Sequence, residues 1–167
     1  MAKKFAVAAW VVLALAGCGM NPPKTESAGA GSAPLVCKAV DAKEIGALFD
    51  RWNRSLQTGD AHAVVANYAA RSILLPTVSN KPRVTAAEKL DYFEHFLENK
   101  PSGTIDFSFI DIGCNSALDA GLYTFVFAKT GARVAARYTF TYAWDGREWL
   151  ITSHHSSVMP EGGGSAK

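Results

Sequence analysis

Residues 136–151 read ARYTFTYAWDGREWLI, and this stretch decides the fold because it holds one strand, a turn and the start of the next strand. Aromatic side chains occupy every second position from Tyr138 to Trp144, which is the period of a β-strand with one apolar face. Asp145-Gly146 follows, and this pair is typical of the tight turn in a β-hairpin. The stretch therefore predicts an antiparallel pair of strands with one strongly aromatic face.

The same alternation extends over the C-terminal half of the chain. A second turn pair, Thr130-Gly131, joins this stretch to an earlier strand that also carries aromatic residues at alternate positions. In the strand before that one the alternation changes phase, so we expect a β-bulge near Ile110-Asp111. We expect the strands at residues 104–114, 118–128, 132–144 and 148–158.

Helices are predicted before these strands. Residues 41–58 open with the capping-box pattern and carry apolar side chains at helical spacing. A shorter helix follows Asp60 and includes Tyr68, residues 73–75 form a short strand, and a second capping box opens a helix over residues 85–99. Helices packed on one face of an antiparallel sheet make an α+β domain.

The N-terminus has the pattern of a processed targeting segment. Lys3 and Lys4 precede an apolar run, residues 5–16, that is short for a membrane span. Leu15-Ala16-Gly17-Cys18 resembles the bacterial lipobox, which implies cleavage before Cys18 and a lipid on its sulfur. The alternative is an ordinary secretory signal. Because Gly19 and not Asp follows, we expect an outer-membrane anchor that faces the periplasm.

These observations divide the chain into four parts. We expect a signal peptide over residues 1–17, a lipidated cysteine and flexible tether over 18–36, a folded domain over 37–161 and a flexible tail over 162–167. The formal net charge of +2 comes from the two lysines of the signal peptide. The mature chain therefore has no overall basic field, and no nucleic-acid partner is expected.

Two cysteines remain once Cys18 carries the lipid. Cys37 and Cys114 would lie in an oxidising compartment, where a disulfide persists. Such a bond would close a long loop, and by reducing the chain entropy of the unfolded state it would stabilise the fold by roughly 4 kcal/mol. The alternative is two buried free thiols.

Six segments occur in an order that resembles the association-domain family of calcium/calmodulin-dependent protein kinase II and its bacterial SnoaL-like relatives. They are LFDRWNRSLQTGD (48–60), ILLPTVSNKPR (73–83), YFEHFL (92–97), GLYTFVF (121–127), ARYTFTYAWDGREWLI (136–151) and HHSSVMPE (154–161). The resemblance implies a cystatin-like, cone-shaped roll of the nuclear-transport-factor-two type, with three helices on a curved, mostly antiparallel sheet. It also implies dimers or higher oligomers that form through the sheet. The chain contains no kinase domain, so kinase activity is not implied.

A pocket is expected inside the cone. We place the helices on the face of the sheet that carries Arg137, and we predict that a dimer buries the aromatic face, although the helices are an alternative cover for it. The predicted cavity residues are Arg137, His154, Ser156, Thr124, Tyr68, Trp52 and Tyr92. Kinase hubs carry pocket arginines where this chain has Thr124 and Ser156, so a small anionic ligand would depend on Arg137, with help from Arg83. The alternative is an internal ion pair of Arg137 with Asp50, Asp91 or Glu94.

HHSSVMPE is expected to form a wall of this pocket. Neighbouring residues on a strand face opposite sides, so His154 and His155 cannot easily share a metal, and no metal site or cofactor is expected. We predict His154 and Ser156 toward the cavity, with His155 and Ser157 on the other side beside Trp149 and Ile151. No G-x-S-x-G motif supports a nucleophilic serine.

The sequence thus predicts a periplasm-facing lipoprotein with an oligomerising module that binds a small ligand or a protein. The alternative is a SnoaL-like enzyme, of isomerase, cyclase or hydrolase type, with acid–base chemistry by His154 or Asp91. The fold alone cannot decide between these functions.

Overall fold

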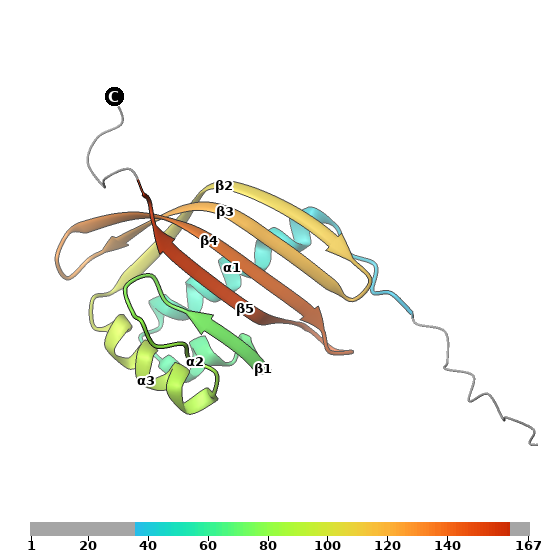
Figure 1. Ribbon diagram of the computed structural model, residues 1–167, viewed down its shortest axis with the longest axis horizontal. Helices are drawn as coiled ribbons and strands as arrows, with labels where there is room; N and C mark the ends of the chain where they lie inside the picture. Colours follow the sequence, from blue (N-terminus) through green and yellow to red (C-terminus); the bar gives the residue numbers. More distant parts are fainter. Residues whose placement is uncertain (1–35, 161–167) are drawn as a thin grey trace, which may run out of the picture. The chain divides into compact units, whose positions relative to one another are not determined.

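A five-stranded sheet with the strand order β1-β5-β4-β3-β2 forms the centre of the computed structural model, which describes residues 36–160 (Figure 1). Its strands are β1 (Tyr68–Leu75), β2 (Pro101–Gly113), β3 (Ser116–Phe127), β4 (Ala132–Trp144) and β5 (Trp149–Val158). Only the β1–β5 pair is parallel, and the other three pairs are antiparallel. The predicted α+β class is therefore confirmed.

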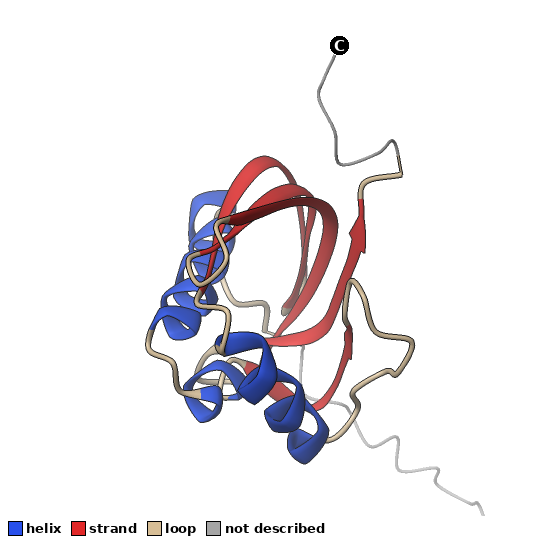
Figure 2. Cartoon of the chain, turned by 90° about the vertical axis from the view of Figure 1, so that its left-hand side faces the viewer, coloured by secondary structure: helices blue, strands red, loops and turns tan. Residues whose placement is uncertain are grey.

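The helices lie against one face of this curved sheet (Figure 2). They are α1 (Ala42–Gln57), α2 (Ala61–Val65) and α3 (Ala86–Leu97). Both predicted capping boxes, at the starts of α1 and α3, are present. Tyr68 does not belong to a helix as expected. It opens β1 opposite Ile151 of β5, whose backbone N–H donates to the carbonyl of the preceding residue, Asn67, at 2.9 Å.

The aromatic face of the sheet packs against the helices. Trp52 of α1 lies edge-on to Phe93 of α3 and to Phe125 and Phe140 of the sheet, with ring centroids 5.6–6.3 Å apart. Tyr138, Phe140 and their neighbours are almost fully buried in this way. The prediction that a dimer interface buries this face is wrong, because the helices cover it within one chain.

Two bulges set the phase of the antiparallel strands. The β2–β3 register shifts between Ile105 and Phe107, not near Ile110-Asp111 as expected. At this point β2 passes so close to Gly121 that a Cβ there would lie 1.9 Å from the Phe107 carbonyl oxygen. Close approach of the two backbones, which only glycine permits, accompanies the bulge.

The second bulge lies in β5. The β4–β5 register shifts between Thr141 and Tyr142, so that Ile151 pairs with Tyr142 and Ser153 pairs with Thr141. The additional residue turns Trp149 and Ile151 to the same face as His154. The expectation that Trp149 and Ile151 point away from His154 is therefore wrong.

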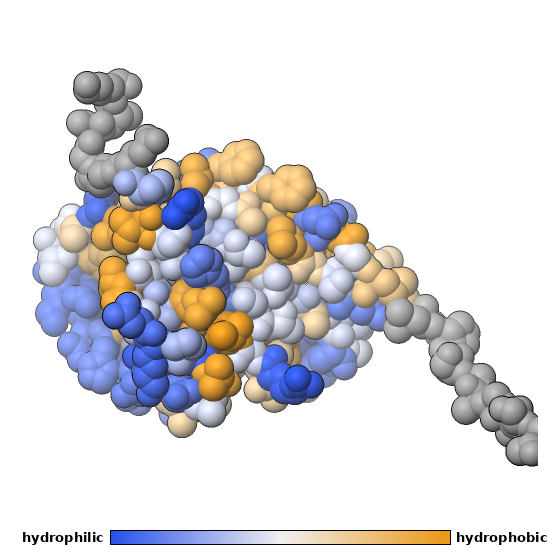
Figure 3. Space-filling view, in the orientation of Figure 1, coloured by the Kyte–Doolittle hydropathy of each residue, from blue (hydrophilic) through white to orange (hydrophobic). Residues whose placement is uncertain are grey.

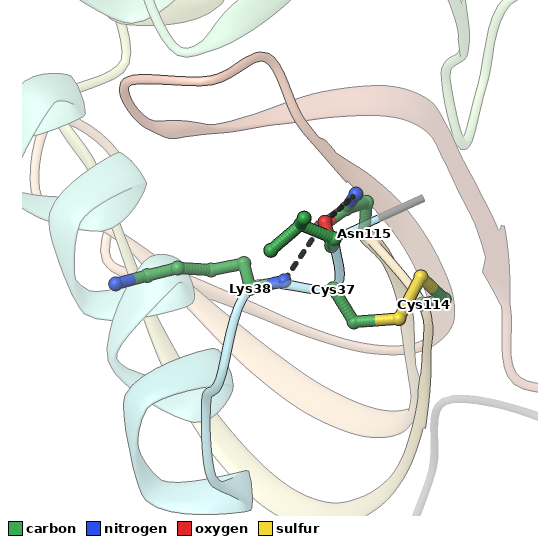
Figure 4. Close-up of a disulfide and its surroundings, with 5 residues drawn as sticks. Cys37, Lys38, Cys114 and Asn115 are labelled. Atoms are coloured by element: carbon green, nitrogen blue, oxygen red, sulfur yellow. Dashed lines mark hydrogen bonds between the residues drawn. A yellow bond between two sulfur atoms is a disulfide. The ribbon is translucent and has the colours of Figure 1, made fainter. Parts of the chain in front are cut away.

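A disulfide fastens the beginning of the domain to the β2–β3 hairpin (Figure 4). Cys37 and Cys114 are bonded, as predicted, across a sequence separation of 77 residues. The side chain of Asn115 adds two hydrogen bonds, because it accepts from Lys38 N at 2.7 Å and donates to Val36 O at 2.9 Å. These contacts hold the chain entry against the hairpin tip.

Apolar surface follows β2 along the upper edge of the view in Figure 3. Phe107 and Phe109 of this strand are 59% and 60% exposed and lie on the face of the sheet away from the helices. The expected signal peptide, Cys18, the expected tether up to residue 35 and the expected tail lie outside the described residues. Across residues 36–160, no helix has the length and apolarity needed to cross a membrane.

Candidate functional site

A cavity of about 440 Å³ lies between α3, the loop after β1 and the inner face of β3, β4 and β5. Its walls are mainly aromatic and aliphatic, with Phe96, Phe125, Phe127, Val134 and Ala136 among them. A cavity of this size and character is typical of small-molecule sites, in which a few polar groups orient the ligand. Apart from His95 and Asn99, the polar side chains that line this cavity form two groups.

The first polar group is a cluster of hydroxyls on one wall. Ser156 of β5 accepts a hydrogen bond from the Tyr123 hydroxyl of β3 at 2.5 Å and shares another with the Thr77 hydroxyl from the loop after β1. Tyr123 and Ser156 are only 3% and 6% exposed. Burial raises the pKa of Tyr123 above its ordinary value, so this side chain remains a neutral phenol that can donate.

His154 stands two residues before Ser156 on the same face of β5. Its Nδ1 lies 2.9 Å from the Tyr68 hydroxyl, and its ring stacks on Phe140 with centroids 4.1 Å apart. Burial lowers the pKa of His154 to about 3, with a smaller contribution from His155, so the imidazole is neutral at neutral pH. Its Nε2 is buried and has no protein hydrogen-bond partner.

The second polar group contains Arg83. Its Nη1 lies 3.5 Å from the Asp91 carboxylate, and its guanidinium lies over the ring of Tyr92 at 5.8 Å from the centroid. The Arg83 side chain is 14% exposed, whereas that of Asp91 is 62% exposed. The buried Nε of Arg83 has no hydrogen-bond partner. Arg83 therefore retains a donor that its ion pair does not use.

The structure brings together part of the predicted site. Trp52, Tyr92, Arg83, His154 and Ser156 line the cavity. Tyr68 is not among the lining residues but contacts His154 through its hydroxyl. The strand alternation that placed His154 and Ser156 inside, and His155 outside, is confirmed by their burial.

Arg137 and Thr124 do not belong to this site. Both lie on the outer face, where Arg137 is exposed and Thr124 donates a hydrogen bond to Asp106 at 2.7 Å. Within residues 36–160, no ion pair involves Arg137. The expectation is wrong because the helices cover the aromatic face of β4, which turns the arginines of that strand outward.

Sequence reasoning missed Thr77 and Tyr123. Tyr123 belongs to the aromatic face for which a dimer interface is predicted above, and nothing in the pattern marks its hydroxyl. Thr77 follows a strand-ending proline, and only the fold brings this loop to Ser156. In the part of the chain that the structure describes, no group of three histidine, cysteine or acidic side chains could hold a metal ion.

The family model for the calcium/calmodulin dependent protein kinase II association domain matches residues 41–160. The chain belongs to this family. A solved structure from Xanthomonas campestris that is assigned to the same association domain is 45% identical, with a TM-score of 0.70, and the match covers 78% of this chain and all of that chain. Membership of the association-domain family confirms the resemblance drawn from the six segments.

More distant structures show the fold alone. A nuclear-transport-factor-two-like protein with a cystatin-like fold from Novosphingobium aromaticivorans is 11% identical over 74% of this chain and 84% of its own, with a TM-score of 0.62. The iota-carbonic anhydrase of a cyanobacterium, complexed with bicarbonate, is 20% identical over 78% of this chain and 99% of its own, with a TM-score of 0.64. The predicted cystatin-like fold is thus confirmed. No curated protein matches this association domain significantly.

Proposed function

We propose that this association domain is an oligomerising module whose cavity binds a small oxyanion of the bicarbonate or carboxylate class. The observation that carries the proposal is the hydroxyl cluster of Thr77, Tyr123 and Ser156 beside the neutral imidazole of His154. A cluster of neutral donors in an apolar cavity interacts strongly with negative charge because little water competes for it.

The number of hydroxyl protons in the cluster favours a ligand that accepts hydrogen bonds. Tyr123 gives its proton to Ser156, so Ser156 and Thr77 have two hydroxyl protons left and share one hydrogen bond. One of these protons is free for a ligand. If the Tyr68 hydroxyl donates to Nδ1 of His154, Nε2 carries a hydrogen and is a second donor.

Arg83 would stabilise the negative charge of the ligand. Its guanidinium lines the same cavity, and its ion pair with the mostly exposed Asp91 leaves the buried Nε unused. A partly buried cation attracts an anion from solvent more effectively than a fully exposed one. Acid–base catalysis by Asp91 or His154 has less support, because Asp91 is exposed and the pKa of His154 is lowered to about 3.

A second candidate function is the interconversion of carbon dioxide and bicarbonate at the same cluster. The apolar walls suit carbon dioxide, and the hydroxyls suit the negative charge that develops on its oxygens when water adds to carbon and releases its proton to solvent water. The bicarbonate complex of the iota-carbonic anhydrase with the same fold makes bicarbonate the first ligand to test.

Calorimetric titration with sodium bicarbonate, sodium acetate and sodium chloride tests the binding proposal. We expect saturable binding of the two oxyanions, and a loss of several-fold in affinity in Ser156→Ala. His155→Ala is the matched control, because this neighbour lies on the outer face. Equal binding of chloride, or equal affinities in the two variants, would exclude the hydroxyl cluster as the site.

Stopped-flow measurement of carbon dioxide hydration tests the second candidate with the same proteins. The enzyme hypothesis requires a rate above that of buffer which falls in Ser156→Ala and not in His155→Ala. Oxyanion binding without any rate enhancement would leave the domain as a binding module.

The outer face of the sheet is the surface that we assign to oligomerisation. Phe107 and Phe109 are more than half exposed there, and Arg137 and Asp106 lie on the same face. A second copy that packs on this face would cover both rings and bring opposite charges together. We also propose that Cys18 carries a lipid and holds the module at the envelope membrane, facing the periplasm.

A further inference from the structure

Lys89 is a buried cation without an acidic partner. It lies on the inner side of α3 and is 1% exposed. No ion pair between residues 36 and 160 includes it. Its neighbour Glu88 is engaged elsewhere, because its carboxylate accepts from Thr85 N at 3.1 Å and pairs with Lys81 at 3.4 Å. A lone buried charge is costly, so its position calls for a physical explanation.

The contacts of Lys89 join three parts of the domain. Its Nζ donates to the carbonyl of Ser72 in β1 at 3.0 Å and to that of Val84, before α3, at 3.2 Å. It also lies 5.8 Å from the ring centroid of Tyr68, within the range of cation–π attraction. Burial lowers the pKa of Lys89, and the negative charge of the neighbouring Glu88 opposes this shift.

Tyr68 connects this cation to the cavity. Its ring faces the ammonium, and its hydroxyl lies 2.9 Å from Nδ1 of His154. Burial raises the pKa of Tyr68 well above its ordinary value, so the phenol keeps its proton. A positive charge beside a phenol makes the hydroxyl a stronger donor and a weaker acceptor. In the hydrogen bond between Tyr68 and His154, the hydroxyl of Tyr68 is therefore the donor and Nδ1 of His154 the acceptor.

We propose that Lys89 is a positioning residue which, through Tyr68, keeps His154 in the tautomer that carries its hydrogen on Nε2 and so offers a donor to an oxyanion in the cavity. The inference deepens the proposed function and rests on it, because this donor matters for binding only if the cavity takes an oxyanion. A purely structural lysine would hold β1 and the Val84 loop to α3 without any effect on His154.

Nitrogen NMR of the imidazole distinguishes these two roles without any ligand. In the wild-type protein at neutral pH we expect a protonated Nε2 and an unprotonated Nδ1. Lys89→Gln keeps a donor for a backbone carbonyl but removes the charge, and Lys89→Met removes both. We expect both variants to shift the His154 tautomers toward protonated Nδ1. Tyr68→Phe should produce the same shift with Lys89 intact.

Three results would overturn the inference. One is that His154 of the wild-type protein carries its hydrogen on Nδ1. This measurement requires no variant, so it tests the inference even if the Lys89 variants do not fold. Another is an unchanged tautomer in folded Lys89→Gln, which would reduce Lys89 to a structural role. The third is an unchanged tautomer in Tyr68→Phe.

Bicarbonate titration of the same variants separates this inference from the proposed function. We expect Lys89→Gln to weaken bicarbonate binding by about three- to ten-fold, the value of one hydrogen bond. A shifted tautomer with no bicarbonate binding even in the wild type would reject the proposed function but retain the role of Lys89 toward His154. Full bicarbonate affinity in a variant with a shifted tautomer would reject the role of Nε2 as the ligand donor.

Discussion

The hydroxyl of Tyr123 donates to Ser156 at 2.5 Å across the inside of the cone, although β4 separates their strands β3 and β5 in the sheet. Figure 2 shows that the sheet is curved, and this curvature accounts for the contact between residues of two strands that are not neighbours. The contact converts two residues of a packed aromatic face into part of a polar site. Its removal is therefore a direct test of the cavity.

Tyr123→Phe is expected to weaken bicarbonate binding and to lower the free energy of unfolding by about 1 kcal/mol, because it removes one buried hydrogen bond. Urea unfolding and calorimetric titration measure the two effects. Thr124→Val is the matched control, since the neighbouring hydroxyl bonds Asp106 on the outer face. Equal losses of affinity in both variants would show that the effect is not specific to the cavity.

We expect the folded protein to lose stability in mild acid because the buried His154 resists protonation. Its pKa in the folded protein, about 3, lies below the ordinary value of 6.5, so the unfolded chain binds the proton more readily. The stabilisation is complete above pH 6.5 and is lost as the pH falls toward 3. Between pH 6.5 and 4.5, the free energy of unfolding should fall by up to about 1.4 kcal/mol per pH unit relative to His154→Gln.

Urea unfolding over this pH range checks the expectation. His155→Gln, on the exposed face, should keep the wild-type pH dependence. The window stops at pH 4.5 because Glu88, whose pKa is lowered to about 2 by backbone hydrogen bonds, adds its own acid dependence below that value. Parallel curves for wild type and His154→Gln would contradict a buried neutral histidine.

The disulfide should contribute substantially to stability. Cys37→Ser with Cys114→Ser opens a loop of 77 residues, and chain entropy predicts a loss of about 4 kcal/mol. Urea unfolding of the double variant and of the wild type, with and without reductant, measures it. Reductant should affect only the wild type. If it has no effect on the wild-type curve, the two thiols are not paired in solution.

The outer face should control the oligomeric state. Phe107→Asp with Phe109→Asp is expected to convert the assembly to monomers in light scattering, because two charges replace two exposed rings. Val84→Asp is the control, since Val84 is 53% exposed but lies in the loop before α3. A monomeric wild-type domain would refute oligomerisation through this face.

Cys18→Ser should release the protein from membranes. We propose that the anchoring lipid is attached to the sulfur of Cys18, in the lipobox-like segment Leu15-Ala16-Gly17-Cys18. Serine has no sulfur and would carry no lipid. Fractionation of cells that express the full chain compares the two forms. Identical distributions between membrane and soluble fractions would reject the lipid anchor.

Much of the fold could be predicted from local pattern. The alternation from Tyr138 to Trp144, the two hairpin turns and both capping boxes specify strands and helices through neighbours in sequence. Six segments in order sufficed to assign the family. The count of cysteines and the expected oxidising compartment favoured the bond between Cys37 and Cys114, with two free thiols as the alternative, and the structure has the bond. These features depend on short-range geometry or on composition.

The sequence by itself determined that the sheet has two unlike faces and that His154 and Ser156 share one of them. Only the tertiary structure decided which face is inside, because alternation separates two faces without stating which one the helices cover. The helices cover the aromatic face, since that burial removes the most apolar surface from water, and Arg137 therefore lies outside. The site itself required the third dimension, because curvature of the sheet and the loop after β1 bring Tyr123 and Thr77 to Ser156.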